Sequence, residues 1–301
     1  MSANPEAQPI IMRLGYSPET RLVILHADDV GMCHAETQSF IETTAAGLVR
    51  CGSIMAPCPW VPYIARVAGE NPAMDLGAHI TLNAEWREYR WGAISTRDPA
   101  GGLLDGQGCL WRSTEETHRH MDPEAAIIEI RAQVEYLLSL GIDLTHIDTH
   151  MGTVFHPALL SAYIELGLSY RLPVMVPRSL PEMMAQHGMP EEVIAQVRPA
   201  YDRLVAAGYP LIDRVVACSG GAEKRLEQYI RILEELPPGI THLLFHAATP
   251  GPEIEAITTG WAERVADHRV FTDPALREYI DSRSDLVIIG YRDLRDALRA
   301  M

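Results

Sequence analysis

Two adjacent acidic residues, Asp28 and Asp29, follow the apolar run LVIL with only His26 and an alanine between. Neighbouring carboxylates repel each other, and burying either one is costly unless a cation or hydrogen bonds compensate. One aspartate could serve as the N-cap of a helix predicted at about residues 34–46. That role leaves the second aspartate unexplained. We therefore consider a bound cation, which would require further ligands elsewhere in the chain.

Further polar residues end three other apolar runs. GAHITL contains His79, THIDTH contains His146, Asp148 and His150, and LLFHAATPG contains His246. In a strand, residues 146, 148 and 150 point to the same face, and that combination is expensive to bury without a shared function. A lone histidine in an apolar strand is more often a satisfied core residue, so the other two histidines gain weight only from their position at strand ends.

These residue types can form a hydrolytic metal site. Two histidines and one carboxylate leave coordination positions open for water and substrate. If Asp29, His79 and His150 bind the metal, Asp28 is left as a general base for a metal-bound water. Asp148 can then orient one of the ligand histidines from behind.

The elements that must position these residues alternate between short apolar strands and longer helical segments. Seven or eight such units in about 280 residues predict an α/β fold, a TIM-like (β/α) barrel that could be distorted or seven-stranded. The carboxyl ends of the strands would bring the polar groups to one rim. We expect a single domain over residues 1–301, with a long loop insertion at about 83–121 and a second long loop at about 249–273, and each loop could be a lid or a substrate wall.

Composition narrows the classes of partner and location. The chain has 301 residues, 47% of them apolar, and a formal net charge of −15, which argues against nucleic acid and anionic membranes. None of the five cysteines forms a CxxC pair, the N-terminus lacks the pattern of a signal peptide, and no apolar run reaches the length of a membrane span. We therefore expect a cytoplasmic protein with reduced thiols.

The motifs together resemble those of the YdjC/ChbG-like carbohydrate deacetylases. HADDVG resembles their A-D-D-F-G opening, GAHITL their G-x-H-x-x-L segment, THIDTH with the later HP their H-x-D-S-H block followed by proline, and FHAATPG their late H-P-G segment. The match covers about residues 22–291 in the right order. The resemblance implies a distorted barrel that carries a metal-dependent hydrolase, which removes acetyl groups from N-acetylated sugars such as chitooligosaccharides.

The resemblance also implies a role for individual residues. It assigns Asp28 as the catalytic base and Asp29, His79 and His150 as ligands of one divalent metal ion, Mg²⁺ or Zn²⁺. A metal-bound water would attack the amide carbonyl, and His246 would protonate the leaving amine or stabilise the oxyanion.

Supporting roles are expected for four other side chains, as neighbours of the metal ligands or as substrate contacts: His146, Asp148, Trp86 and Arg178. Trp86, in EWREYRWG, would offer an aromatic face to a sugar ring. The segment after His150 reads HMGTVFHP and departs from the family pattern, which leaves the sugar open.

Two other functions compete with this one. Another barrel metallohydrolase of the amidohydrolase type would typically show H-x-H at the end of the first strand, where this chain has H-A-D-D. A non-catalytic, metal-containing sugar-binding barrel would have no need of Asp28. The sequence also allows a homodimer.

Overall fold

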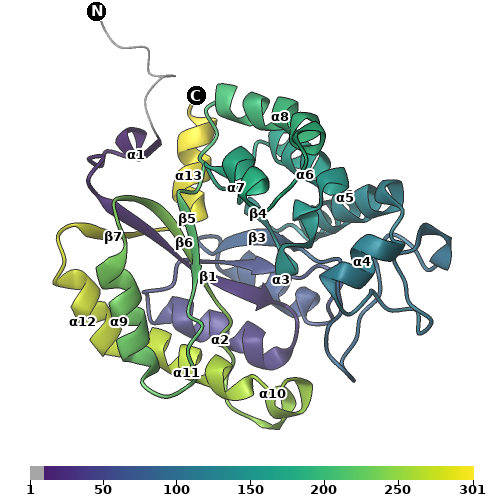
Figure 1. Ribbon diagram of the computed structural model, residues 1–301. Coiled ribbons are helices and arrows are strands. Elements are labelled where there is room, and N and C mark those ends of the chain that lie inside the picture. The colour runs from purple at the N-terminus through teal and green to yellow at the C-terminus, as the bar shows by residue number, and fades with distance from the viewer. Residues whose placement is uncertain (1–9) are drawn as a thin grey trace, which may run out of the picture.

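The computed structural model describes residues 10–301, and its strands form one parallel sheet surrounded by helices (Figure 1). Residues 1–9, which include the start of the expected single domain and of the segment expected to lack a signal peptide, lie outside the described residues. The strands are β1 (Arg21–Val30), β2 (Cys51–Ile54), β3 (Asp75–Ile80), β4 (Leu144–Thr149), β5 (Arg214–Ala217), β6 (Gly239–Phe245) and β7 (Leu286–Ile289).

Helices connect nearly all of these strands, as expected for βα units. They are α1 (Ile10–Arg13), α2 (His34–Ala45), α3 (Val61–Glu70), α4 (Thr114–His120), α5 (Pro123–Ser139), α6 (Pro157–Tyr170), α7 (Leu180–Gln186), α8 (Glu191–Ala206), α9 (Arg225–Glu235), α10 (Pro252–Ile257), α11 (Trp261–Thr272), α12 (Pro274–Asp281) and α13 (Tyr291–Arg299), with the short 3₁₀ helices η2 (Pro99–Gly101) and η3 (His150–Phe155).

The sheet runs in the order β4-β3-β2-β1-β6-β5, and β7 also pairs with the first half of β1. Two isolated parallel bridges continue the pairing beyond β4: Ile147 with Val174, and Pro177 with Ile212, which lies two residues before the start of β5. Backbone pairing thus returns from β4 to β5 through single bridges. The predicted α/β class is confirmed, and the segment LPVMVP supplies these bridges where the sequence predicted a further strand.

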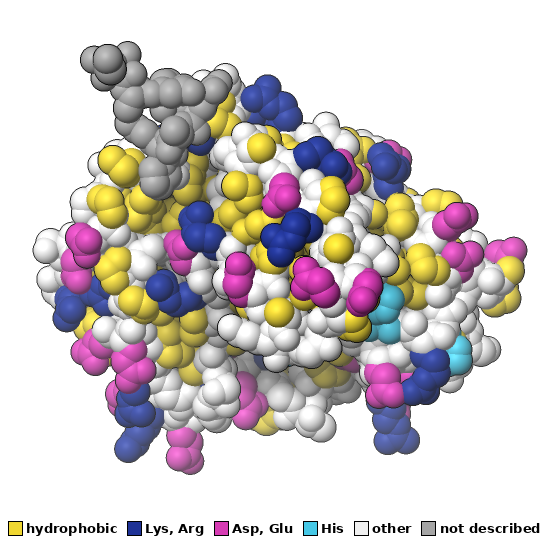
Figure 2. Space-filling view, turned by 45° about the horizontal axis from the view of Figure 1, so that its top comes forward, with side chains coloured by type: hydrophobic (Ala, Val, Ile, Leu, Met, Phe, Trp, Pro, Cys, Tyr) yellow, Lys and Arg dark blue, Asp and Glu magenta, His cyan; other side chains and the backbone are white. Residues whose placement is uncertain are grey.

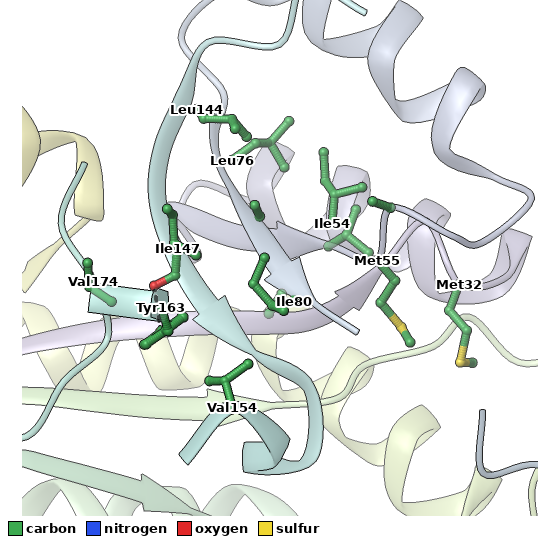
Figure 3. Packing of buried hydrophobic residues seen from close by; sticks show 14 of the residues in the cluster. Met32, Ile54, Met55, Leu76, Ile80, Leu144, Ile147, Val154, Tyr163 and Val174 are labelled. Atoms are coloured by element: carbon green, nitrogen blue, oxygen red, sulfur yellow. Dashed lines mark hydrogen bonds between the residues drawn. The ribbon is translucent and has the colours of Figure 1, made fainter. Parts of the chain in front are cut away.

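Side chains of β1 point alternately into two hydrophobic clusters, one on each face of the sheet. Val23 and Leu25 belong to the large cluster between the sheet and its helices, part of which is shown in Figure 3, where Tyr163 lies beside Ile147. Leu22 and Ile24 belong to a smaller cluster that also takes in residues of α1 and α13. Successive strand residues point to opposite faces, so the second cluster fills the inner side of the sheet near the amino ends of the strands.

The two segments expected to be long loops differ in structure. Residues 83–113 contain only η2 and one antiparallel bridge, between Leu104 and Leu110, before α4 begins. The expectation of a loop at 249–273 is wrong, because α10 and α11 occupy most of it. The error arose because neither helix carries a strong apolar stripe.

On the face shown in Figure 2, acidic and basic side chains are interspersed among apolar ones. Among the described residues, no helix combines the length and apolar character needed to cross a membrane.

Candidate metal and catalytic site

An irregularity in β1 turns both aspartates toward the same space. The pairing register of β1 with β2 shifts between Ala27 and Val30, and Asp29 has a left-handed backbone with φ of 61°. An extra residue in one strand breaks the alternation of side chains, and non-glycine residues in this conformation are frequently found at functional sites. The bulge explains how two consecutive strand residues can serve one site.

Three ligand atoms converge beyond the carboxyl ends of β1, β3 and β4. Asp29 Oδ1 lies 3.1 Å from His150 Nδ1 and 3.5 Å from His79 Nε2. The candidate ligand atoms of these three residues all lie within 4.8 Å of one another, and the two imidazole centroids are 5.4 Å apart. The predicted convergence of these three residues is therefore present.

The second nitrogen of each imidazole is already held by a carboxylate. His79 Nδ1 lies 2.9 Å from Asp148 Oδ1 and 2.9 Å from the Ser53 hydroxyl, which itself donates to Asp148 Oδ2 at 2.8 Å. His150 Nε2 lies 2.9 Å from Glu85 Oε2. Such contacts fix the ring orientation and leave Nε2 of His79 and Nδ1 of His150 to face a cation.

A metal ion fits this site because two of its buried atoms lack partners. Asp29 Oδ1 and His79 Nε2 are shielded from solvent, yet neither makes a hydrogen bond among the described residues. Buried polar atoms are rarely left unsatisfied, and two imidazoles with one carboxylate form a donor set typical of divalent metals that keep positions open.

The carboxylates around His79 and His150 also favour a positive charge at this site. Burial alone would lower the pKa of His79, but Asp148 and Asp28 outweigh it and raise the pKa well above its usual value. Burial is likewise outweighed at His150, where Glu85 and Asp29 raise the pKa to about 9. Without a metal, the rings of His79 and His150 are therefore protonated, and their extra protons occupy the space where a metal ion would bind.

Asp28 lies beside this triad with one oxygen free for chemistry. Its Oδ1 is bonded to His26 Nδ1 at 2.7 Å, while Oδ2 lies 4.0 Å from His79 Nε2 and 3.8 Å from His246 Nε2. Burial would raise the pKa of Asp28, but His79 and His26 hold it below the usual value, so the carboxylate is ionised at neutral pH. Half-exposed His246 has a pKa lowered by desolvation and by Arg264, which leaves its ring neutral.

Arg264 of α11 orients Asp29 from the other side. Its guanidinium donates to Asp29 Oδ2 at 3.1 Å and also to buried Glu36, and it lies over the ring of Trp86, 5.3 Å from the ring centroid. This contact occupies one oxygen of Asp29 and would leave Oδ1 available to a metal ion. It also places half-buried Trp86 near the site, and the Trp86 indole N–H points to the sulfur of Met32.

A second layer of histidines lies deeper in the barrel. His26 Nε2 is 2.8 Å from His146 Nε2, and His242 Nδ1 is 2.8 Å from the Tyr291 hydroxyl. His26, Asp28, Asp148 and His242 also lie close enough together to hold a metal. Both ring nitrogens of His26 are already bonded, however, so this group fits a cation less well than the triad above it.

Arg178 does not reach the site. Its side chain pairs with Asp213 at 2.6 Å, and Asp213 accepts from the backbone N–H of Ile240, at the amino end of β6. This is the end of the barrel opposite the metal triad, so the structure contradicts the expected role of Arg178 beside the substrate.

The sequence did not indicate three groups that hold the candidate ligands in place: Ser53, Glu85 and Arg264. Ser53 stands in the strand β2, in line with the other strand-end residues, and that position could have indicated it. Glu85 and Arg264 follow no strand-end pattern and become visible only through their contacts.

The fold and site together define a parallel α/β barrel with a candidate metal centre at the strand ends. The chain matches the YdjC-like protein family over residues 22–282 and belongs to that family, as its motifs predicted. A carbohydrate deacetylase from Thermus thermophilus is 32% identical over 296 residues, which cover 96% of this chain and 99% of the relative. One from Thermoanaerobacter pseudethanolicus is 26% identical and covers 91% and 100%.

A solved structure supports the fold independently. An Enterococcus faecalis V583 protein, whose name refers to cellobiose-phosphate cleavage, superposes with a TM-score of 0.74 at 19% identity, covering 91% of this chain and 99% of that one. At this level of identity the likeness concerns the fold alone.

Proposed function

We propose that this protein is a metal-dependent hydrolase that removes the acetyl group from an N-acetylated sugar or chitooligosaccharide. The observation that carries the proposal is the convergence of two unpartnered buried atoms, Asp29 Oδ1 and His79 Nε2, with His150 Nδ1 beside an ionised Asp28. The names of the Thermus and Thermoanaerobacter relatives, both carbohydrate deacetylases, support this class of substrate and bond.

The triad Asp29, His79 and His150 would hold one divalent ion, Zn²⁺ or Mg²⁺. Such an ion would polarise the amide carbonyl and make a water more acidic. Two imidazoles favour zinc by ligand type, while the resemblance to the deacetylase family also makes magnesium a candidate.

The remaining steps belong to side chains of this chain. Asp28 accepts the proton of the attacking water through Oδ2, since Oδ1 is held by His26. His246, whose neutral ring lies 3.8 Å from Asp28 Oδ2, is placed to take up the proton that Asp28 has accepted from the water and to pass it to the leaving nitrogen. The C–N bond breaks, and the products are acetate and the free amino sugar. Trp86 would contact the sugar with the ring face that Arg264 leaves open.

The direct test is acetate release from N-acetylated mono- and oligosaccharides, with and without a chelator. We expect release that stops on chelation and returns when Zn²⁺ or Mg²⁺ is added. Release that continues in a protein shown to be free of metal would contradict the proposed mechanism, and no release from any sugar with metal present would contradict the activity. Cytoplasmic location and a homodimer remain predictions, which fractionation and light scattering can check.

A further inference from the structure

A continuous chain of hydrogen-bonded side chains leads away from Asp28 through the barrel interior. Asp28 Oδ1 lies 2.7 Å from His26 Nδ1, and His26 Nε2 lies 2.8 Å from His146 Nε2. His146 Nδ1 lies 2.9 Å from the Thr145 hydroxyl, which donates to Asp75 Oδ1. All five side chains are buried. This is an unusual number of titratable groups to place in one unbroken series within a core.

The hydrogen-bonded series ends at Asp75, at the opposite end of the barrel from the metal triad. Asp75 begins β3 and His79 stands four residues later, a separation of about 13 Å along an extended strand. Asp75 Oδ2 accepts from the backbone N–H of Arg292 at 2.7 Å. Asp75 also lines a cavity of about 260 Å³ together with Arg50, Arg292 and Asp293. The series therefore connects the candidate base with a cavity remote from the metal triad.

Hydrogen-bond directions along the series allow two proton arrangements. If Asp75 is a carboxylate, it accepts from Thr145, which accepts from His146 Nδ1–H. His146 Nε2 then accepts from His26 Nε2–H, and His26 also donates to Asp28, so that His26 is an imidazolium. If Asp75 is protonated, every bond from Asp75 to His26 reverses and His26 is neutral. The two arrangements hold the same number of protons, and they differ by the net transfer of one proton between Asp75 and His26. Their balance becomes sensitive to pH only because the series can release that proton to solvent at the cavity beside Asp75, which leaves Asp75 ionised and His26 neutral.

The surroundings allow Asp75 to gain or lose this proton near pH 6. Burial raises the pKa of Asp75 to about 6, although the backbone N–H of Arg292 and the Thr145 hydroxyl oppose it. Burial and His26 lower the pKa of His146 well below its usual value, so its ring relays a proton without keeping one. Asp28 at 2.7 Å and Asp148 at 3.7 Å can both stabilise a positive His26.

Other groups facing the series are neutral or already paired. His242 lies against His26 with ring centroids 4.5 Å apart, and burial lowers its pKa to about 3. Tyr291 stacks on His146 at 3.9 Å, and burial raises the pKa of its hydroxyl. Burial also keeps the Cys51 thiol protonated by raising its pKa. Around Asp75, Arg292 pairs with Asp143, and Arg50 lies 3.8 Å from Asp293.

Gly77 provides the space that this series needs. A Cβ atom at that position would lie 2.4 Å from the His146 ring, closer than any real contact. The glycine therefore lets His146 sit between β3 and the Tyr291 ring, where it can bridge His26 and Thr145.

We propose that Asp75, Thr145, His146 and His26 form a proton wire that places or withdraws a positive charge beside Asp28. These four are positioning residues, since none of them faces the substrate. Their effect on turnover rests on the proposed function, whereas the proton transfer itself does not.

The test compares Thr145→Val, which cuts the wire with little change in volume, and Asp75→Asn with a matched control, Thr43→Val. Thr43 is also buried and donates its hydroxyl proton, but to the backbone of its own helix α2. Ring-¹⁵N NMR of the full zinc-loaded chain between pH 5 and 8 reports the protons on His26 and His146, and kcat and KM for an N-acetylated sugar are measured over the same range.

We expect the ring signals of His26 and His146 to shift together near pH 6 in the unaltered protein and in Thr43→Val. Thr145→Val and Asp75→Asn should abolish the joint shift, lower kcat by about tenfold on one side of pH 6 and leave KM unchanged. Independent or absent shifts of the two histidines, or a kcat that follows the same pH profile in all variants, would overturn the proposal. Joint shifts in a protein that releases no acetate would instead refute the proposed function and leave the proton transfer in place.

Discussion

Glu85→Gln offers a quantitative test of how the metal site is charged. Glu85 is the first of the carboxylates that raise the pKa of His150 to about 9 against the effect of burial. A metal binds only the neutral imidazole, so below pH 9 its binding must displace a proton, and the apparent affinity rises with pH. At pH 7 the competition from His150 alone amounts to about 2.7 kcal/mol, two pKa steps at about 1.4 kcal/mol each. His79, whose pKa is also raised, adds a second proton.

The expected proton count at pH 8 is about two in the unaltered protein and closer to one in Glu85→Gln, because His150 then moves toward its usual pKa of about 6.5. Isothermal titration calorimetry of Zn²⁺ binding, repeated in buffers of different ionisation enthalpy, measures this count. Glu88→Gln is the control, since Glu88 lies exposed in the same loop and, within residues 10–301, has Arg87 as its only ion-pair partner. An equal count in Glu85→Gln and in the unaltered protein would refute the reasoning, as would the absence of proton release in both.

Two further predictions concern stability, measured by urea unfolding. Gly77→Ala should cost about 1–3 kcal/mol, because its Cβ would collide with the His146 ring. Gly69→Ala in α3 should be neutral or stabilising, because among the described residues a Cβ there would meet no atom within 4 Å outside its own helix backbone and chain neighbours. Similar losses in both variants would contradict the steric argument. Arg264→Ala should cost about 1–3 kcal/mol by leaving buried Glu36 without its hydrogen-bond donor, because burial already raises the pKa of Glu36 well above its usual value and the carboxyl group can protonate; adding Glu36→Gln should recover part of that loss. No recovery in the double variant would show that Arg264 acts through something other than this pair.

The sequence was informative where side chains follow strands. Apolar runs predicted all seven strands, and because parallel strands end at one rim, the residues Asp29, His79 and His150 could be expected to meet. Asp148 shares a strand face with His150, and the structure places it in hydrogen-bond contact with His79 on the neighbouring strand, the position from which it was predicted to orient a histidine. These inferences depend only on strand periodicity and direction.

The sequence was uninformative where contacts depend on loops, bulges and distant helices. Nothing in the pattern around Asp29 indicates the left-handed backbone that turns both aspartates inward. Glu85 and Arg264 reach the site from segments that have no regular spacing to it. Arg178 was predicted to lie near the substrate, and its pairing with Asp213 at the other end of the barrel rules that position out. Such contacts are set by tertiary packing, which local periodicity does not encode.

The most direct test of the proposed mechanism measures metal content and turnover of Asp28→Asn and Asp29→Asn side by side, at several metal concentrations. Asp28→Asn should keep its metal and lose about 10²–10⁴-fold in kcat, because an amide cannot accept the proton of water. Asp29→Asn should bind metal weakly and recover part of its activity in excess metal, because one of three ligands is impaired. Loss of metal from Asp28→Asn with retention in Asp29→Asn would reverse the two roles, and unchanged turnover in both variants would contradict the mechanism.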